Sequence, residues 1–172
     1  MALGVWLVAL GIDQLTKLIV VSRLEWGESV EVLGSLVRFT LVSNPGAAFG
    51  LGGEATLIFA IFATLVAVGL LVFGLPRISR PWHAVVLGLL LGGITGNLYD
   101  RMTQPPSFMH GHVVDFIQLP YFAIFNVADI CITVAAGVII VMSVWGERKE
   151  SRDGESSDGE SRDSESRDGV EA

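Results

Sequence analysis

The sequence predicts an all-α membrane protein, with four transmembrane helices and a small antiparallel sheet outside the bilayer. The first observation is composition: 51% of the 172 residues are hydrophobic, and the mean hydropathy is +0.59. An ordinary soluble domain of this size is less apolar. The second is that the apolar residues gather in four blocks long enough to cross a bilayer. The third is a pair of β-rich runs after the first block.

The four predicted transmembrane helices cover Ala2–Val21, Ala55–Phe73, Trp82–Leu98 and Ala123–Trp145. The first lacks a basic stretch at its start and contains Asp13 and Lys17, which favours a membrane helix over a cleavable signal peptide. The third is short, at about 17 residues where about 20 are usual. Its glycines recur every four residues and let a neighbouring helix approach closely; they are Gly88, Gly92 and Gly96.

The sheet is expected in the two longer connections, residues 22–54 and 99–122. The first connection contains SVEVLGSLVRFTLV, residues 29–42, in which Gly34-Ser35 is a turn signal between two β-rich runs. This pattern predicts a hairpin. In the second connection, HVVDFIQL and YFAIF can add short strands before the fourth helix. Together these elements form one membrane domain, residues 1–146.

The remaining residues, 147–172, are predicted to be a disordered acidic tail. They hold 10 acidic and 5 basic residues in Ser-Arg-Asp and Asp-Gly-Glu-Ser near-repeats, with hardly any apolar side chain. The membrane domain carries 8 acidic and 6 basic residues, a net charge of −2. Nothing in this distribution indicates nucleic-acid binding.

Four crossings place both termini on the same face as the short loop Gly74–Pro81. Arg77 and Arg80 lie in that loop, and Arg148 directly follows the fourth helix. Basic residues in short loops favour the cytoplasmic side, so we expect cytoplasmic termini. The count is close, however, because the other face also has basic residues; they are Lys17, Arg23, Arg38 and Arg101.

The polar residues that stand in apolar surroundings all fall at the outer ends of helices or in the outer loops. They are Asp13, Lys17, Asn44, Asn97, Asp100, Arg101, Asp115, Asn126 and Asp129. They come from separate segments and should converge on one membrane boundary. Residues three or four apart share a helix face, and the pairs at this spacing are Asp13 with Lys17, Asn97 with Arg101, and Asn126 with Asp129.

Asp115 and Asp129 are the carboxylates that resist a structural explanation, because apolar residues flank both. A charge within a span costs about 2.5–3.5 kcal/mol, so such residues are functional hypotheses. Counted from Ala123, Asp129 should lie roughly 9 Å into its helix. Two carboxylates in a poorly hydrated site share one proton, so that one protonates a carbonyl while the other activates water. Aspartic proteases use this division of labour.

Alternatives remain for several of these residues. Asp13 and Lys17 favour a structural or positioning pair over a catalytic one. Asp100 can pair with Arg101, and Arg101 can equally hold another carboxylate or a substrate carbonyl. His110, His112 and Asp115 have spacing suggestive of a metal site, but the histidines lie in a Gly- and Pro-bearing loop, which makes a metal less favoured. The single cysteine, Cys131, excludes an intrachain disulfide.

Two other functions compete with hydrolysis. Intramembrane carboxylates often mark ion pathways, so a small ion-coupled transporter is the main alternative. Its difficulty is that no ionisable residue of the second or fourth helix marks a path to the other face. A non-enzymatic scaffold, with its carboxylates neutralised by Lys17 and Arg101, is the second.

Five motifs resemble, in order and spacing, the sequence boxes of bacterial lipoprotein signal peptidase, also called signal peptidase II. They are DQLTK, NPGAAFG, GGITGNLYDR, VVDFI and FNVAD, and the resemblance covers about Gly11 to Val144. It implies a multi-pass aspartic endopeptidase of the bacterial inner membrane. Such an enzyme cleaves the signal peptide from diacylglyceryl-modified prolipoproteins immediately before the lipidated cysteine. Its termini would be cytoplasmic, with the active site and a small β-cradle at the outer face.

The same resemblance assigns the residues. It implies Asp115 and Asp129 as the catalytic pair. The supporting residues that match the family are Asp13, Lys17, Asn44, Asn97, Arg101 and Asn126. It implies no metal or organic cofactor, prolipoprotein substrates and membrane lipids as partners, and inhibition by the peptide antibiotic globomycin. The chain departs from the family in lacking basic residues before Lys17 and in its acidic tail.

Overall fold

The computed structural model describes residues 1–46 and 54–145. By its contacts the chain divides into two compact units, Met1–Ala135 and Ala136–Ala172. All contacts described below lie within the first unit. In the second, the described residues 136–145 continue a helix that begins in the first. The predicted disordered tail lies outside the described residues.

Four helical segments of the described chain are long and apolar enough to cross a membrane, which confirms the predicted class. Their spans are Ala2–Arg23, Thr56–Arg77, Pro81–Thr103 and Val127–Trp145. The first and third spans are helix α1, Ala2–Arg23, and helix α3, Pro81–Thr103. The second span consists of helix α2, Glu54–Gly69, followed by a π-helical turn, Leu70–Gly74, and a 3-10 turn, Leu75–Arg77. The fourth helix, Val127–Trp145, has no label in the figures. Large apolar side chains on α2, such as Phe62 and Leu65, are 64% and 66% exposed, as expected where a helix faces lipid.

Two boundaries differ from the sequence prediction. Helix α3 continues to Thr103, so Asp100 and Arg101 lie in its last turn rather than in the loop. The fourth helix begins at Val127 and not at Ala123. Asp129 is therefore its third residue, about 3 Å from its start at 1.5 Å per residue, and the predicted depth of 9 Å is wrong.

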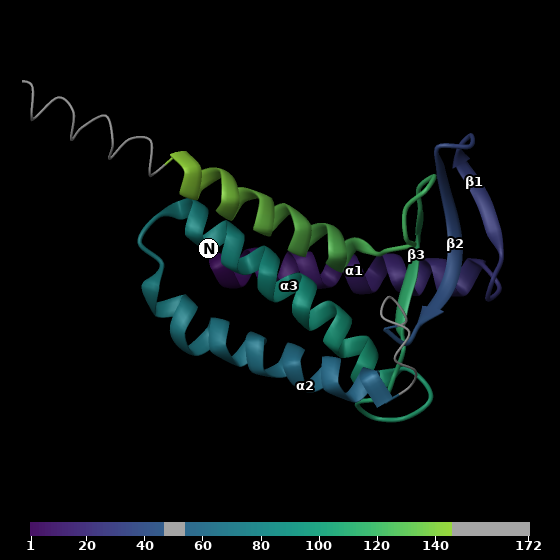
Figure 1. Cartoon of the computed structure of the whole chain (residues 1–172), viewed down its shortest axis with the longest axis horizontal. Coiled ribbons are helices and arrows are strands. Elements are labelled where there is room, and N and C mark those ends of the chain that lie inside the picture. Colours follow the sequence, from purple (N-terminus) through teal and green to yellow (C-terminus); the bar gives the residue numbers. More distant parts are fainter. Residues whose placement is uncertain (47–53, 146–172) are drawn as a thin grey trace, which may run out of the picture. The chain divides into compact units, whose positions relative to one another are not determined.

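Three antiparallel strands form one sheet in the order β1, β2, β3 (Figure 1). Strands β1, Ser29–Leu33, and β2, Val37–Asn44, make the predicted hairpin, and Gly34 adopts a positive φ of 54° in its turn. Strand β3, Val113–Gln118, pairs with β2, with Val42 opposite Asp115. Of the YFAIF stretch, only Phe125 contributes, through an isolated bridge to Ile117.

One face of the sheet packs on the C-terminal end of α1. The buried cluster there consists of Val20, Leu41, Val114 and Phe116. Because side chains alternate along a strand, Asp115 lies on the opposite face from Val114 and Phe116. The sheet is thus anchored to α1 by its apolar face, while its other face carries a carboxylate.

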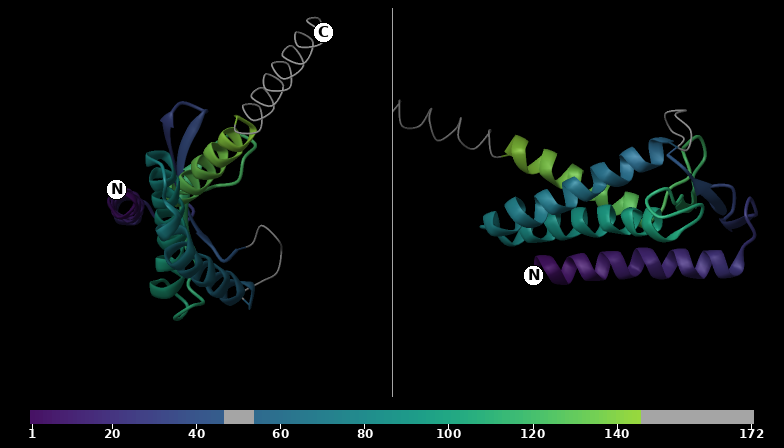
Figure 2. Two further views of the ribbon diagram at one scale, coloured as in Figure 1. Left: turned by 90° about the vertical axis from the view of Figure 1, so that its left-hand side faces the viewer. Right: turned by 90° about the horizontal axis from the view of Figure 1, so that it is seen from below.

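Helices α1 and α3 lie side by side and both end at the sheet (Figures 1 and 2). The glycines of α3 make this possible. A Cβ added to Gly88 would lie 2.6 Å from the Cβ of Val5, and one added to Gly92 would lie 2.5 Å from the Cβ of Ala9. The predicted glycine strip therefore does pack against a neighbouring helix.

Candidate active site

Asp115, on β3, is held at both carboxylate oxygens. Its side chain is buried, at 2% exposure. Oδ1 accepts a hydrogen bond from Asn126 Nδ2 at 2.6 Å, and Oδ2 accepts one from Asn44 Nδ2 at 2.7 Å. Burial, above all, raises the pKa of this carboxyl from 3.8 to about 6; the hydrogen bond from Asn44 lowers it, and the neighbouring charge of Asp129 raises it.

Asn44 has two roles that its position at the end of β2 makes compatible. Its Nδ2 donates to Asp115, while its Oδ1 accepts from the backbone N–H of Gly46 at 2.9 Å. The second bond is the local turn contact expected of Asn before Pro-Gly. Gly46 has a φ of 96°, which favours glycine. The turn thus fixes the amide that orients Asp115.

Asp129 is half-buried in the first turn of the fourth helix. Its Oδ1 accepts from Asn97 Nδ2 at 2.9 Å, and its Oδ2 accepts from the backbone N–H of Asn126 at 3.2 Å. In return, Asn126 Oδ1 accepts from the backbone N–H of Asp129 at 3.0 Å. This reciprocal pair is a capping box, in which Asn126 is the N-cap residue. The helix terminus therefore sets the conformation of Asp129.

Asn126 links the two carboxylates. Besides capping the helix of Asp129 and donating to Asp115, its Nδ2 lies 3.0 Å from Asn97 Oδ1. Asn97 Oδ1 also accepts from Lys17 Nζ at 3.1 Å, which leaves the Nδ2 of Asn97 to donate to Asp129. One buried amide and one half-buried amide thus connect both aspartates to the Lys17 ammonium.

Lys17 lies between two buried carboxylates. Its Nζ is 2.9 Å from Asp13 Oδ2 and 2.8 Å from Asp100 Oδ2, and all three side chains are at most 4% exposed. The predicted pairing of Asp13 with Lys17 is correct. Asp100 makes its ion pair with Lys17, and among the described residues it makes none with Arg101.

Arg101 lies near Asp115 and Asp129. Its Nη1 donates to the carbonyl of Asn97 at 3.3 Å, and its guanidinium carbon is 5.9 Å from the centre of the Phe59 ring. Its Nε is buried and has no hydrogen-bond partner within the described part of the chain. The guanidinium group of Arg101 thus has one buried N–H group that no described residue accepts.

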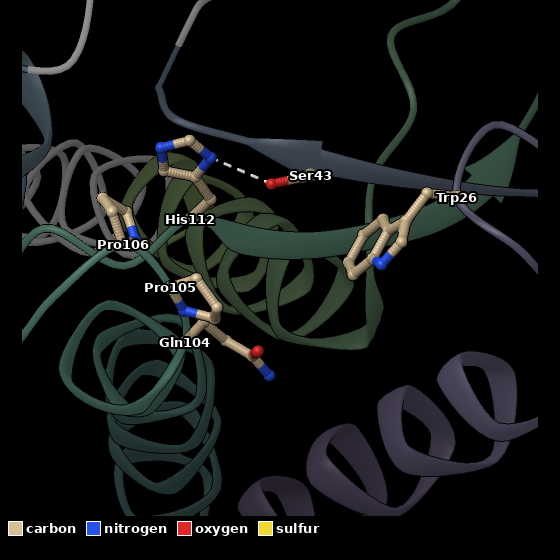
Figure 3. Close-up of a pocket in the computed structure, with 6 residues that line it drawn as sticks. All are labelled: Trp26, Ser43, Gln104, Pro105, Pro106 and His112. Atoms are coloured by element: carbon tan, nitrogen blue, oxygen red, sulfur yellow. Dashed lines mark hydrogen bonds between the residues drawn. The ribbon is translucent and has the colours of Figure 1, made fainter.

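The alternative metal site would use His110, His112 and Asp115. His112 Nδ1 lies 2.9 Å from Ser43 Oγ, and the two side chains face each other (Figure 3). They line a cavity of about 390 Å³ together with Trp26, Gln104, Pro105 and Pro106. No group of three or more His, Cys, Asp or Glu side chains within residues 1–46 and 54–145 is arranged to hold a metal ion.

The structure thus brings every site residue predicted from the sequence to one end of the helices. Two further residues belong to the same network. Asp100 was absent from the predicted supporting set, although it lies three residues after Asn97 on the same helix face. Gln14, which the sequence analysis did not single out, donates to Asp13 Oδ2 at 3.0 Å, to the Gly96 carbonyl at 3.1 Å and to Asp100 Oδ1 at 3.3 Å.

The arrangement suits one kind of chemistry. Two carboxylates joined through a shared amide, one buried with a raised pKa and one half-buried, can hold a single proton between them. The protonated carboxyl can donate to an oxygen atom, and the ionised one can deprotonate water.

Known proteins that are similar to this chain are signal peptidases. The chain matches the family model for Signal peptidase (SPase) II over residues 5–145. It is 44% identical over 135 residues to the lipoprotein signal peptidase of Leifsonia xyli subsp. xyli (strain CTCB07), covering 78% of this chain and 62% of that protein. It is 40% identical over 146 residues to that of Mycobacterium tuberculosis (strain ATCC 25618 / H37Rv), covering 85% of this chain and 72% of that protein. The chain thus spans less than two thirds of the length of the Leifsonia relative.

The fold is similar to that of a bacterial membrane enzyme solved by the in meso method at 2.3 Å resolution. The TM-score is 0.73 at 28% identity, over 83% of this chain and 87% of the solved one. The named relatives are peptidases and give no support to the transporter alternative. A family model that matches most of the sequence, relatives of 40–44% identity and a shared membrane fold agree, and the chain belongs to the signal peptidase II family.

Proposed function

We propose that this protein is a membrane aspartic endopeptidase that cleaves the signal peptide from diacylglyceryl-modified prolipoproteins, immediately N-terminal to the lipidated cysteine. The observation that carries this proposal is the linkage of Asp115 and Asp129 through Asn126, which contacts both. The names of the relatives supply the substrate class, and the paired carboxylates supply the chemistry.

In the proposed mechanism, Asp115 and Asp129 are the catalytic pair and hold one proton. Asp115 takes the protonated role, because burial raises its pKa. Asp129 is more exposed, and its carboxylate accepts hydrogen bonds from Asn97 and a backbone N–H, so we assign it the role of base. Asp129 then removes a proton from water as the oxygen attacks the scissile carbonyl, while Asp115 protonates the carbonyl oxygen.

Breakdown of the tetrahedral intermediate completes the reaction. The proton that Asp129 took from water passes to the leaving nitrogen, and the C–N bond breaks. The intermediate's hydroxyl returns its proton to the pair, so that the products are a carboxylic acid and an amine and no covalent enzyme intermediate forms. We assign Arg101, in the last turn of α3, to orient a substrate carbonyl with its guanidinium group.

The membrane arrangement follows from the lipidated substrate. We infer that the end of the helices that carries the sheet is the outer face of the cytoplasmic membrane, with the termini in the cytoplasm. The acyl chains of the substrate remain in the bilayer, while the sheet holds the segment around the scissile bond extended. The basic residues Arg77 and Arg80, at the opposite ends of α2 and α3, support this orientation.

One experiment tests the proposal. Purified protein in detergent is mixed with a lipidated prolipoprotein, and the products are identified by mass. We expect release of the signal peptide by the wild type and its loss in Asp115→Asn and Asp129→Asn. Glu31→Gln is the matched control, since it removes an exposed carboxylate of β1 that pairs with Arg38, and it should stay fully active. Full activity of either Asp variant would refute the pair, and loss of wild-type activity with EDTA would favour a metal.

A further inference from the structure

Two buried carboxylates outside the proposed catalytic pair make equivalent contacts to the backbone just before each catalytic aspartate. Asp13 Oδ1 accepts a hydrogen bond at 2.8 Å from the backbone N–H of Ala128, the residue before Asp129. Asp100 Oδ2 accepts one at 3.1 Å from the backbone N–H of Val114, the residue before Asp115. Each catalytic aspartate is therefore preceded by a peptide group that a buried carboxylate holds.

A single ammonium group joins the two contacts. Lys17 Nζ pairs with both Asp13 and Asp100, so the two backbone N–H groups are held relative to one charge. Ala128 and Val114 are 0% and 1% exposed. Loss of either carboxylate would therefore remove the protein acceptor of a buried N–H group.

We propose that Asp100 is the positioning residue for Asp115 and that Asp13 is the positioning residue for Asp129. Lys17 binds Asp13 and Asp100, and through them it sets the separation of the two catalytic carboxylates. This inference rests on the proposed function. Neither Asp13 nor Asp100 touches the reacting atoms; each acts through the backbone that leads into a catalytic aspartate.

Packing of α1 against α3 does not depend on Asp100 alone, although Asp100 contacts Lys17 and Gln14 of α1. The two helices also contact each other through the glycine strip, and Trp6 Nε1 donates to Thr95 Oγ1 at 2.8 Å. The bond from Val114 to Asp100 instead crosses from β3 to the end of α3. It is a direct contact between α3 and the strand that carries Asp115, in addition to the packing of that strand on α1.

The charged groups around the pair decide how its titration should be interpreted. Helix α1 presents Asp13 and Lys17, and α3 presents Asp100 and Arg101. The uncharged Asn44 faces Asp115 from β2, and Phe59 of α2 faces Arg101. Asp115 on β3 and Asp129 on the fourth helix both contact Asn126. Two carboxylates held close together share a proton and titrate at two separated apparent pKa values, and moving them apart brings these values together.

The test compares pH profiles of kcat and KM for the wild type, Asp100→Ala and Asp100→Asn. Asp100→Ala should lower kcat about 10²-fold with little change in KM, the effect of a displacement of about 1 Å. It should also narrow the interval between the two apparent pKa values of the profile. Asn at this position keeps an oxygen acceptor for the Val114 N–H, so Asp100→Asn should retain about tenfold more kcat than Asp100→Ala.

Thr95→Val is the control for a purely structural role. It removes the α1–α3 hydrogen bond from Trp6, so it should lower the melting temperature and leave the width of the pH profile unchanged. An Asp100→Ala profile of wild-type width, or equal kcat for the Ala and Asn variants, would overturn the proposal. If Asp100→Ala does not fold, the width of the Asp100→Asn profile decides.

The outcomes also separate this inference from the function on which it rests. An active Asp115→Asn variant would refute the catalytic pair itself. An inactive Asp115→Asn variant together with an unperturbed Asp100→Ala profile would refute the positioning role alone.

Discussion

Substitution of Asn126 separates helix capping from catalysis, because this side chain serves both. Asn126→Ala removes the N-cap acceptor for Asp129 and the donor to Asp115. Loss of an Asn cap costs about 1 kcal/mol, and removal of one partner of a buried hydrogen bond costs about 1–3 kcal/mol. We expect the free energy of unfolding to fall by about 3 kcal/mol in total.

The effect on kcat should exceed what this loss of stability explains. Asp115 and Asp129 would no longer share a partner, and a displacement of about 1 Å in either can lower the rate about 10²-fold. Stability is measured by thermal or chemical unfolding in detergent, and kcat is measured on the folded fraction with a lipidated prolipoprotein.

Asn126→Ser is the matched variant. Ser is as good an N-cap as Asn, but its shorter side chain cannot also reach Asp115. The Ser variant should therefore recover about 1 kcal/mol of stability relative to Ala while remaining as inactive as Ala. A Ser variant with wild-type kcat would refute the argument that Asn126 holds the catalytic pair together.

Three further predictions concern pH, packing and substrate contacts. The raised pKa of Asp115, from 3.8 to about 6, means that the folded state binds the proton more tightly. The contribution of Asp115 to the free energy of unfolding should be greatest below pH 4 and fall by up to about 3 kcal/mol as pH rises through about 6, a dependence that Asp115→Asn should abolish in unfolding experiments. A Cβ at Gly96 would lie 2.6 Å from Asp13 Oδ2, so Gly96→Ala should lower kcat. Gly11→Ala, which meets nothing within 4 Å, should not. Arg101→Gln should raise KM in the cleavage assay, and an unchanged KM would remove its role in substrate contact.

The sequence predicted the helices and the hairpin well, because hydropathy and turn residues determine both locally. The predicted start of the fourth helix, Ala123, is too early, because Ala123–Phe125 continue the apolar run. In the structure Phe125 instead bridges to Ile117. Hydropathy cannot distinguish an apolar strand residue from a helical one, but the spacing of Asn126 and Asp129 contains a capping signal that marks the true boundary.

The partner of Asp100 was harder to predict. Adjacent residues on a helix do not face each other, so once α3 is known to reach Thr103, Asp100 and Arg101 must point to different neighbours. That Asp100 meets Lys17 depends on the close approach of α1, which the glycine strip permits. Sequence spacing identified the strip, but the rotation of one helix against the other comes only from the packed structure.

The central claim is that Asp115 and Asp129 act as one unit in peptide-bond hydrolysis. The most direct measurement compares single-turnover cleavage of a lipidated prolipoprotein by Asp115→Asn, Asp129→Asn and the double variant. Groups that share one proton are strongly non-additive, so all three variants should show the same residual rate. A single variant with near wild-type rate, or a double variant whose loss is the product of the two single losses, would contradict the account.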